Sequence, residues 1–145
     1  MIKKILVAYD NGVKSQKALE TAIEIAKGSK AEICLLVSVK MPQFISTVTS
    51  IDILKDLEEK NRQYFMDILK ESEDKVGKEG IPVKSVILNE SPGEAIVSYA
   101  NKEKFDLIVM GSANRGTVER VLLGLGSVSN YVLHHAKCSI LIIKN

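Results

Sequence analysis

The chain has 145 residues, of which 46% are hydrophobic and 26% charged, and its net charge is only +2. These values are typical of one globular domain with a proper core, spanning residues 1–145, and they give no electrostatic argument for nucleic-acid binding. No segment approaches the about 18 consecutive apolar residues of a membrane span, and the N-terminal apolar stretch is too short for a signal peptide. We therefore expect a cytoplasmic protein that does not contact membranes.

The first part of the chain predicts two strands with a helix between them. Residues 2–9 form an apolar, β-branched run that stops at a turn-like Asp-Asn-Gly sequence, and residues 31–39 form a second such run. Continuous apolar runs are typical of strands that are buried on both faces. The intervening segment has apolar residues at helical spacing, and we predict that Ser15 caps this helix and that Gly28 ends it.

The middle of the chain begins with residues 40–50, which we interpret as a mobile flap because they lack charge after the initial lysine. Residues 51–78 have the pattern of a long amphipathic helix, closed at Gly80. Residues 82–88 alternate apolar and polar side chains, as an edge strand does. The Ser-Pro-Gly-Glu sequence at 91–94 then predicts a capping box with proline at the first helical position.

The last part of the chain predicts strand, loop, helix and strand. An apolar run at 107–110 stops at Gly111, a loop rich in glycine follows, and Ser127 is in position to cap a helix that precedes the apolar run 139–143. Glycines let a loop approach a ligand closely, and the free N–H groups at a helix N-terminus form a phosphate site.

The alternation of strands and helices predicts the α/β class: a single-domain, doubly wound sheet of five parallel strands with helices on both faces. Ligands of such sheets bind outside the carboxyl ends of the strands where the strand order reverses. With the order 3-2-1-4-5, the reversal brings Ala8 and Asp10 beside Met110 and Gly111. The reversal of strand order therefore predicts a binding site at these residues, independently of any sequence motif.

Three parts of the sequence resemble the universal stress protein family, and the resemblance covers the whole chain. They are the N-terminal ILVAYD, the DLIVMGS strand end, and the run VERVLLGLGSVSNYVLHHAKCSILIIK. In the nucleotide-binding branch of that family the loop reads Gly, two residues, Gly, nine residues, then Gly-Ser or Gly-Thr. The resemblance implies the doubly wound fold, related to that of adenine nucleotide alpha hydrolases, and binding of ATP or a related adenine nucleotide.

The loop departs from the family pattern, and two registers are open. In the first, Gly116 and Gly126 keep the nine-residue spacing. In the second, Gly111, Asn114 and Gly124 keep the family spacing, with asparagine in place of the middle glycine. We favour the second, because asparagine tolerates a left-handed backbone better than most residues. Either register leaves two extra residues in the loop.

The resemblance also implies roles for individual residues. Asp10 faces the ribose hydroxyls or a Mg²⁺ ion carried by the nucleotide, and a turn cap is its equally weighted alternative. The main chain near Ser38 contacts adenine, and Ala8 stands where some members have proline. The residues expected along the sugar and the phosphates, with Arg115 as a clamp, are Met110, Gly111, Ser112, Asn114, Arg115, Gly116, Gly124, Gly126, Ser127 and Val128.

Three functions follow in order of preference. The first is a regulatory protein that binds an adenine nucleotide, works with an unidentified protein partner, and is at most a slow or partner-dependent ATPase. The second is a nucleotide-independent homodimeric interaction protein, and the third is a flavin-binding or hydrolytic enzyme. No GxxxxGK[ST] loop, GxSxG elbow or CxxC motif is present in the sequence.

The C-terminal strand predicts self-association. The resemblance implies a homodimer in which residues Ser139–Lys144 of two copies pair antiparallel, and a long apolar edge is normally covered. His134, His135 and Cys138 lack metal-ligand geometry, because adjacent helical residues point about 100° apart. We interpret Cys138 and Cys34 as packed thiols.

Overall fold

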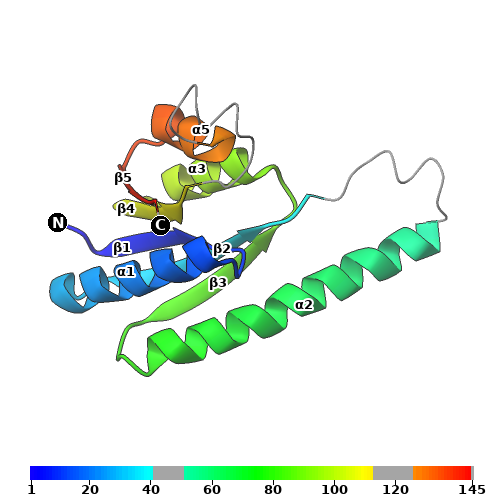
Figure 1. Ribbon diagram of the computed structural model, residues 1–145, viewed down its shortest axis with the longest axis horizontal. Helices are drawn as coiled ribbons and strands as arrows, with labels where there is room; N and C mark the ends of the chain where they lie inside the picture. Colours follow the sequence, from blue (N-terminus) through cyan, green and yellow to red (C-terminus); the bar gives the residue numbers. More distant parts are fainter. Residues whose placement is uncertain (41–50, 113–125, 145) are drawn as a thin grey trace.

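The computed structural model describes residues 1–40, 51–112 and 126–144, apart from the side chain of residue 51, and its centre is a sheet of parallel strands (Figure 1). The strands are β1 (Lys4–Ala8), β2 (Glu32–Ser38), β3 (Val83–Leu88), β4 (Leu107–Gly111) and β5 (Ser139–Ile143). Their order, β3-β2-β1-β4-β5, confirms the predicted doubly wound α/β fold. β3 lies at one edge, as its alternating sequence predicts, and β5 lies at the other.

The central strands are held in register by apolar residues. Ile5 of β1 lies opposite Ile33 of β2 and Leu107 of β4. All three side chains are at most 6% exposed. Parallel strands that are covered on both faces have such continuous apolar sequences, which is why the strands could be predicted from the sequence.

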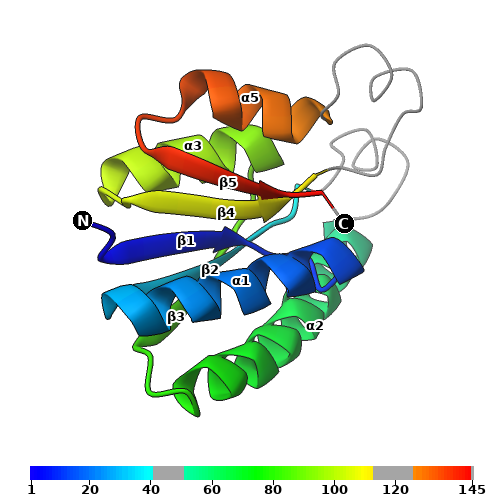
Figure 2. The same ribbon diagram turned by 60° about the vertical axis from the view of Figure 1, so that its left-hand side comes forward.

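Helices cover both faces of the sheet (Figure 2). They are α1 (Val13–Ser29) and α2 (Ile51–Gly77) on one face, and α3 (Pro92–Lys102) and α5 (Ser127–His135) on the other. Because side chains alternate along a strand, Ile5 and Val7 pack in the cluster with α1 and α2, whereas Leu6 packs in the cluster with α3 and α5. The sheet therefore separates two hydrophobic cores.

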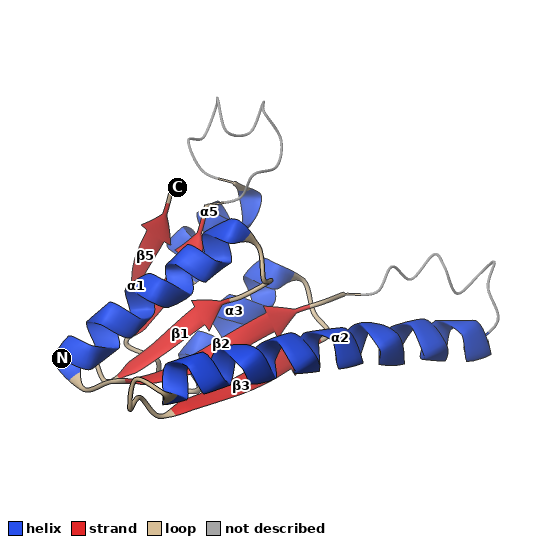
Figure 3. Cartoon of the chain, turned by 60° about the horizontal axis from the view of Figure 1, so that its bottom comes forward, coloured by secondary structure: helices blue, strands red, loops and turns tan. Residues whose placement is uncertain are grey.

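The long helix α2 reaches beyond the carboxyl ends of the strands (Figures 1 and 3). Its C-terminal half is anchored by Leu69 and Val76, which are buried against the sheet and α1. The part of the helix before Leu69 exposes Leu57, Tyr64 and Met66. Residues 41–50, on which the prediction of a flap falls, lie outside the described residues.

The starts of α1 and α5 differ from the prediction. The N-cap of α1 is Gly12, so Ser15 lies inside the first turn and does not cap the helix. The N-cap of α5 is Gly126, so Ser127 is its first residue. Each glycine has an extended backbone, and neither helix has a side-chain cap hydrogen bond. The predicted serine caps are therefore wrong, because the turn before each helix ends one or more residues earlier than the serine.

Two predicted helix ends also shift. α1 continues past Gly28 to Ser29, and Lys30 takes the left-handed backbone with φ of 58°. α2 ends at Gly77, and Gly80 turns the chain with φ of 75°. The positions at which β2 and β3 begin decide where each chain reversal occurs, and local sequence does not contain that information.

The start of α3 is closer to the prediction. The helix begins at Pro92 with Ser91 as N-cap, as the sequence indicates. The Ser91 side chain makes no cap hydrogen bond, so the predicted capping box with Glu94 does not form. The fixed backbone of proline and the extended conformation of the preceding residue are sufficient to start this helix.

Candidate functional site

A cleft of about 460 Å³ opens at the carboxyl ends of β1 and β4, where the strand order reverses. Its lining residues are Ala8, Tyr9, Asp10, Gly12, Val13, Lys14, Ser15, Leu36, Ser38, Pro92, Ile96, Met110, Gly111, Ser112, Ser127, Val128 and Ser129. Small-molecule sites have volumes of roughly 300–1,000 Å³, and open parallel sheets bind ligands at this position. The cleft is therefore large enough and correctly placed for a small ligand.

A smaller cavity of about 190 Å³ lies between α2 and β3 and is lined in part by Glu58, Arg62 and Phe65. It is next to an edge strand and away from the reversal of strand order. The larger cleft is the stronger candidate for a binding site.

The first turns of three helices line the larger cleft. α1 contributes residues 12–15, α3 contributes Pro92, and α5 contributes residues 127–129. The first intrahelical hydrogen bonds are donated by the N–H groups of Gln16, Ala95 and Asn130, so the amides that precede them have no acceptor within their own helix. These amides and the positive ends of three helix dipoles favour an anionic ligand.

Ser129 adds a polar group to the first turn of α5. Its side chain is fully buried, and its hydroxyl has no hydrogen-bond partner among the described residues. Buried hydroxyls normally have a partner, because an unsatisfied one costs about 1–3 kcal/mol. The hydroxyl of this cleft residue is therefore available to a bound group.

Asp10 organises the turn between β1 and α1. Its Oδ1 accepts hydrogen bonds from the Gly12 N–H and from the Ser15 hydroxyl, both at 2.8 Å. Asp10 therefore caps the turn, which is the alternative role that its sequence indicated. The carboxylate also remains exposed and lines the cleft.

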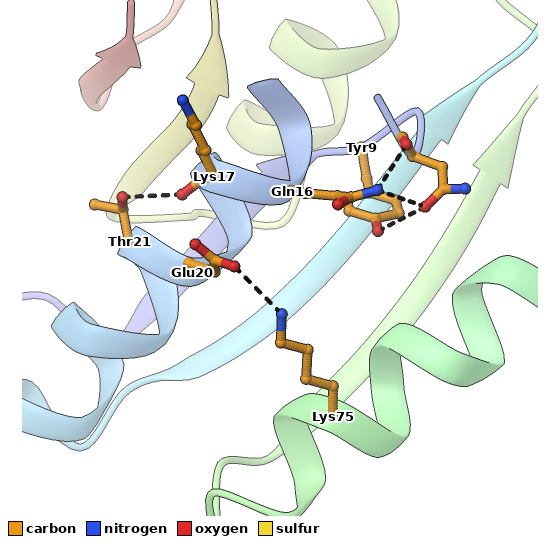
Figure 4. Close-up of polar contacts among 7 residues, drawn as sticks. Tyr9, Gln16, Lys17, Glu20, Thr21 and Lys75 are labelled. Carbon is orange, nitrogen blue, oxygen red and sulfur yellow. Dashed lines mark hydrogen bonds and ion pairs between the residues drawn. The ribbon is translucent and has the colours of Figure 1, made fainter. Parts of the chain in front are cut away.

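A second group of hydrogen bonds, made by Tyr9, Asn11 and Gln16, holds the same turn (Figure 4). Asn11, with a left-handed φ of 66°, accepts a bond from the Tyr9 hydroxyl at 3.1 Å. The Gln16 side-chain amide donates to the Asn11 carbonyl at 2.9 Å. The start of α1 is therefore fixed by contacts on both sides of the turn.

Among the described residues that line the cleft, Lys14 is the one basic side chain and Asp10 is the one acidic side chain. The Lys14 ammonium donates a hydrogen bond to the Ser112 hydroxyl at 3.0 Å. A Cβ atom at Gly111 would lie 2.6 Å from Cβ of Lys14, so only glycine allows this approach of α1 to β4. Sequence reasoning did not select Lys14, because its contact depends on residues near 111 in the folded chain.

Ser38 lies at the end of β2, on the rim of the cleft. Its hydroxyl donates to the Glu90 carbonyl, and the next residue, Val39, donates its N–H to the Leu88 carbonyl at 2.9 Å. These bonds tie the end of β2 to β3 and fix the main chain at this rim.

The structure brings most of the described predicted residues together. Those that line the cleft are Ala8, Asp10, Ser38, Met110, Gly111, Ser112, Ser127 and Val128. Gly126 is buried and caps α5 beside it, without lining it. The predictions for Asn114, Arg115, Gly116 and Gly124, and with them the choice of loop register, lie outside the described residues.

Several lining residues were missed by sequence reasoning. They are Gly12, Val13, Lys14, Ser15, Leu36, Pro92, Ile96 and Ser129, whereas Tyr9 belongs to the strand end that the predicted reversal brings to this place. The signal for Ser15 and Ser129 was present, because each lies in the first turn of a helix that follows a strand of the predicted reversal point. Pro92 and Ile96 had no such signal, since only the packing of α3 beside α5 brings them there.

The cysteines are not poised for nucleophilic chemistry. Burial raises the pKa of the Cys34 thiol to about 11, against smaller lowering effects from a hydrogen bond with Tyr99 and from nearby lysines. Burial likewise raises the pKa of Cys138. Both cysteines are free thiols, as predicted. At neutral pH both stay protonated, and a protonated thiol is a poor nucleophile.

Metal-ligating side chains do not gather in the described part of the chain, where no group of three His, Cys, Asp or Glu residues is placed to hold an ion. His135 instead contacts Tyr131: its Nδ1 lies 2.9 Å from the Tyr131 carbonyl oxygen, and the two rings stack with centroids 4.1 Å apart. Within residues 1–40, 51–112 and 126–144, no helix has the length and apolar character needed to span a membrane.

Comparison with known proteins gives a consistent result. The model of the Universal stress protein family matches residues 1–144. Universal stress protein MJ0531 of Methanocaldococcus jannaschii is 32% identical, with 99% of this chain and 83% of that protein covered.

Solved structures agree with the sequence match. Hypothetical protein MJ0577 has a TM-score of 0.84 at 26% identity, over 100% of this chain and 97% of that chain. A universal stress protein in complex with cAMP has a TM-score of 0.72, also at 26% identity, over 97% of this chain and 96% of that chain.

Proposed function

Since the chain belongs to the universal stress protein family, we propose that it binds an adenine nucleotide, ATP or a close relative, in the cleft between β1 and β4. The observation that carries the proposal is the meeting of three helix N-termini and the Lys14 ammonium around this cleft. Such a site suits phosphate groups. The related protein in complex with cAMP supports an adenine nucleotide as the ligand class.

The two ends of the cleft would bind different parts of the nucleotide. At the β2 end, the main chain near Ser38 would contact adenine, and the Asp10 carboxylate would accept hydrogen bonds from ribose hydroxyls. At the α5 end, the amides of Ser127 and Val128, with Gly126 beside them, would bind the terminal phosphates.

The segment that follows β4 would close the site over the sugar. Gly111 and Ser112 lie at its start, and we propose that Asn114 continues the contact to the sugar and α-phosphate. Arg115 would add a positive charge that neutralises the phosphates. Gly116 and Gly124 belong to the same proposed loop, as the alternative registers require.

A magnesium ion would enter this site with the nucleotide. The fit to the chain rests on Asp10, which lines the cleft and whose Oδ1 is already used by the turn, so that its other carboxylate oxygen would be the one available to the ion. Oxygen ligands are those that Mg²⁺ prefers, and the ion would supply charge neutralisation of the phosphates. Residues of this chain would hold it mainly through the bound phosphates.

We propose that binding, and not rapid turnover, is the activity of the site. Asp10 is the sole carboxylate among the described residues that line the cleft, and its turn contacts hold it away from the role of a mobile general base. Any hydrolysis of ATP would then be slow or would depend on a partner. Occupancy of the cleft would regulate contacts with a protein partner that the sequence does not identify.

The free edge of β5 favours a homodimer as part of the same proposal. Among the described strands β5 pairs only with β4, and its residues Ile140 and Ile142 are partly buried apolar side chains. An unpaired apolar edge is normally covered, and antiparallel pairing of Ser139–Lys144 with a second copy would cover it. The same edge also supports the second candidate function, that of a homodimeric interaction protein that works without nucleotide.

One experiment separates the two candidates. Native mass spectrometry of protein purified without added nucleotide reports subunit number and any retained ligand, and calorimetric titration with Mg-ATP, AMP and GTP gives affinity. We expect a dimer with up to one adenine nucleotide per chain and micromolar or tighter binding. A dimer without binding at millimolar nucleotide would leave the interaction protein as the function, and a monomer would refute the pairing of β5.

A further inference from the structure

Lys14 lies where three features of the cleft meet. It is the second residue of α1, it lies against the end of β4, and its ammonium is 3.0 Å from the Ser112 hydroxyl. Ser112 in turn donates its N–H to the Ile143 carbonyl at 2.9 Å. The hydroxyl that receives Lys14 is thus attached to both β4 and β5.

The contact is held in place by the absence of a side chain at position 111. A Cβ there would lie 2.6 Å from Lys14 Cβ and 3.2 Å from the Lys14 carbonyl carbon. Cβ of Lys14 is therefore packed against the backbone of β4 at Gly111, and its ammonium reaches the hydroxyl of the next residue, Ser112. A long lysine side chain normally loses rotamer freedom when it binds a ligand, and this packing has removed part of that freedom beforehand.

The charge around Lys14 is not neutralised by a neighbour. No ion pair joins it to an acidic residue in the described part of the chain. Its hydrogen-bond partner, a serine hydroxyl, is neutral, so the ammonium keeps its full charge and two further N–H donors. The helix N-termini that share the cleft have the same sign as the ammonium and add to its attraction for an anion, and Asp10 is the one acidic residue among the described lining residues.

We propose that Lys14 is the specificity-determining residue that makes the cleft select nucleotides by phosphate charge, so that affinity rises from adenosine through AMP to ATP. This inference rests on the proposed nucleotide function and extends it to a residue outside the glycine-rich loop. The ammonium moves from the Ser112 hydroxyl, or shares it, to bind a phosphate oxygen. Ser112 acts as the positioning residue that holds the ammonium ready when no ligand is bound.

The test uses Lys14→Met, because methionine keeps an unbranched apolar stem over β4 and removes the charge. Lys17→Met is the matched control: Lys17 lies on the same helix, is exposed, and does not line the cleft (Figure 4). The full-length wild type and both variants are titrated with adenosine, AMP and ATP at low and at physiological ionic strength. Circular dichroism and thermal unfolding establish that each variant is folded.

We expect Lys14→Met to weaken ATP binding by about tenfold or more, as the loss of a charge-assisted hydrogen bond does, and AMP binding by less. Adenosine binding should change less than about twofold, and Lys17→Met should match the wild type with all three ligands. Because the interaction is electrostatic, the preference of the wild type for ATP over adenosine should decrease with added salt more than that of Lys14→Met.

Two outcomes would overturn the inference without touching the proposed function. One is equal weakening of all three ligands by Lys14→Met, which would make Lys14 a structural residue, and the other is unchanged ATP binding by this variant. A wild type that binds none of the three ligands at millimolar concentration would overturn the proposed nucleotide function itself, and charge selection with it.

Discussion

α1 approaches the sheet closely at Gly111, and Gly111→Ala tests whether this contact holds the cleft together. The added methyl group would lie 2.6 Å from Lys14 Cβ, 3.2 Å from its carbonyl carbon and 3.3 Å from its carbonyl oxygen. Two of these three atoms belong to the backbone of a helix, so a side-chain rotation does not relieve the overlap. The first turn of α1 must move away from β4.

Overpacking of this kind destabilises a protein by about 1–3 kcal/mol, which corresponds to a decrease in Tm of roughly 2–12 °C for a domain near 150 residues. Gly28→Ala is the control: Gly28 lies in α1, the helix that Gly111→Ala would displace, and a Cβ at Gly28 meets no atom within 4 Å. We expect that variant to keep or raise the Tm, since alanine is the better helix former. Thermal unfolding followed by circular dichroism measures both.

The same displacement moves Lys14 and the amides of residues 13–15, so Gly111→Ala should also weaken nucleotide binding. Gly28 lies at the far end of α1 from the cleft, and its variant should bind as the wild type does. A Gly111→Ala protein with unchanged Tm would show that α1 and β4 adjust without loss, and the argument from close approach would then be wrong.

Two further predictions concern the dependence of stability on pH. The Asp106 carboxylate accepts backbone hydrogen bonds from Lys3 and Lys4, which lower its pKa, so its contribution is present above about pH 4 and is lost as the pH falls below that value. In urea denaturation, Asp106→Asn should be less stable than the wild type by about 1 kcal/mol at pH 7, and the difference should become smaller near pH 3. An equal difference in stability at both pH values would contradict this account. The Cys34 thiol has a pKa of about 11 in the folded protein, whereas a thiol in the unfolded chain has a pKa of about 8.5. Because only the unfolded chain loses this proton between the two pKa values, the stability of the fold decreases as the pH rises from one to the other. Cys34→Ala should lose less stability than the wild type between pH 8.5 and pH 10.5, by at most about 1.4 kcal/mol per pH unit, and parallel curves would rule out Cys34 as the titrating group.

The strands and their order were predictable because burial on both faces leaves a signature in the local sequence. The apolar runs around Ile5, Ile33 and Ile108 have no alternation, and the alternation at 83–88 identified an edge. The reversal of strand order belongs to the doubly wound fold, which the succession of strands and helices and their right-handed connections favour. The location of the cleft could therefore be predicted together with Asp10 and Gly111.

Helix ends were less predictable because they depend on how the flanking turns fit the sheet. Ser15 has the residue type of a cap, yet in the folded chain its hydroxyl contacts the Asp10 carboxylate, and Gly12 takes the cap position. Lys30 takes a backbone conformation that its own preferences oppose, because the chain must reach β2 within two residues. In each case a tertiary requirement of about 1 kcal/mol exceeds a local propensity of similar or smaller size.

By itself, the sequence determined the fold class, the strand order, the family resemblance and the strand ends at which a ligand would bind. These features depend on which residues are apolar and at what spacing, and that information is local. Only the tertiary structure brought Lys14 to Ser112, 98 residues further along the chain, and placed the first turns of α1, α3 and α5 around one cleft. Contacts across such a separation are set by the packing of helices on both faces of the sheet, so the charge of the cleft is a property of the folded chain and is absent from any single segment.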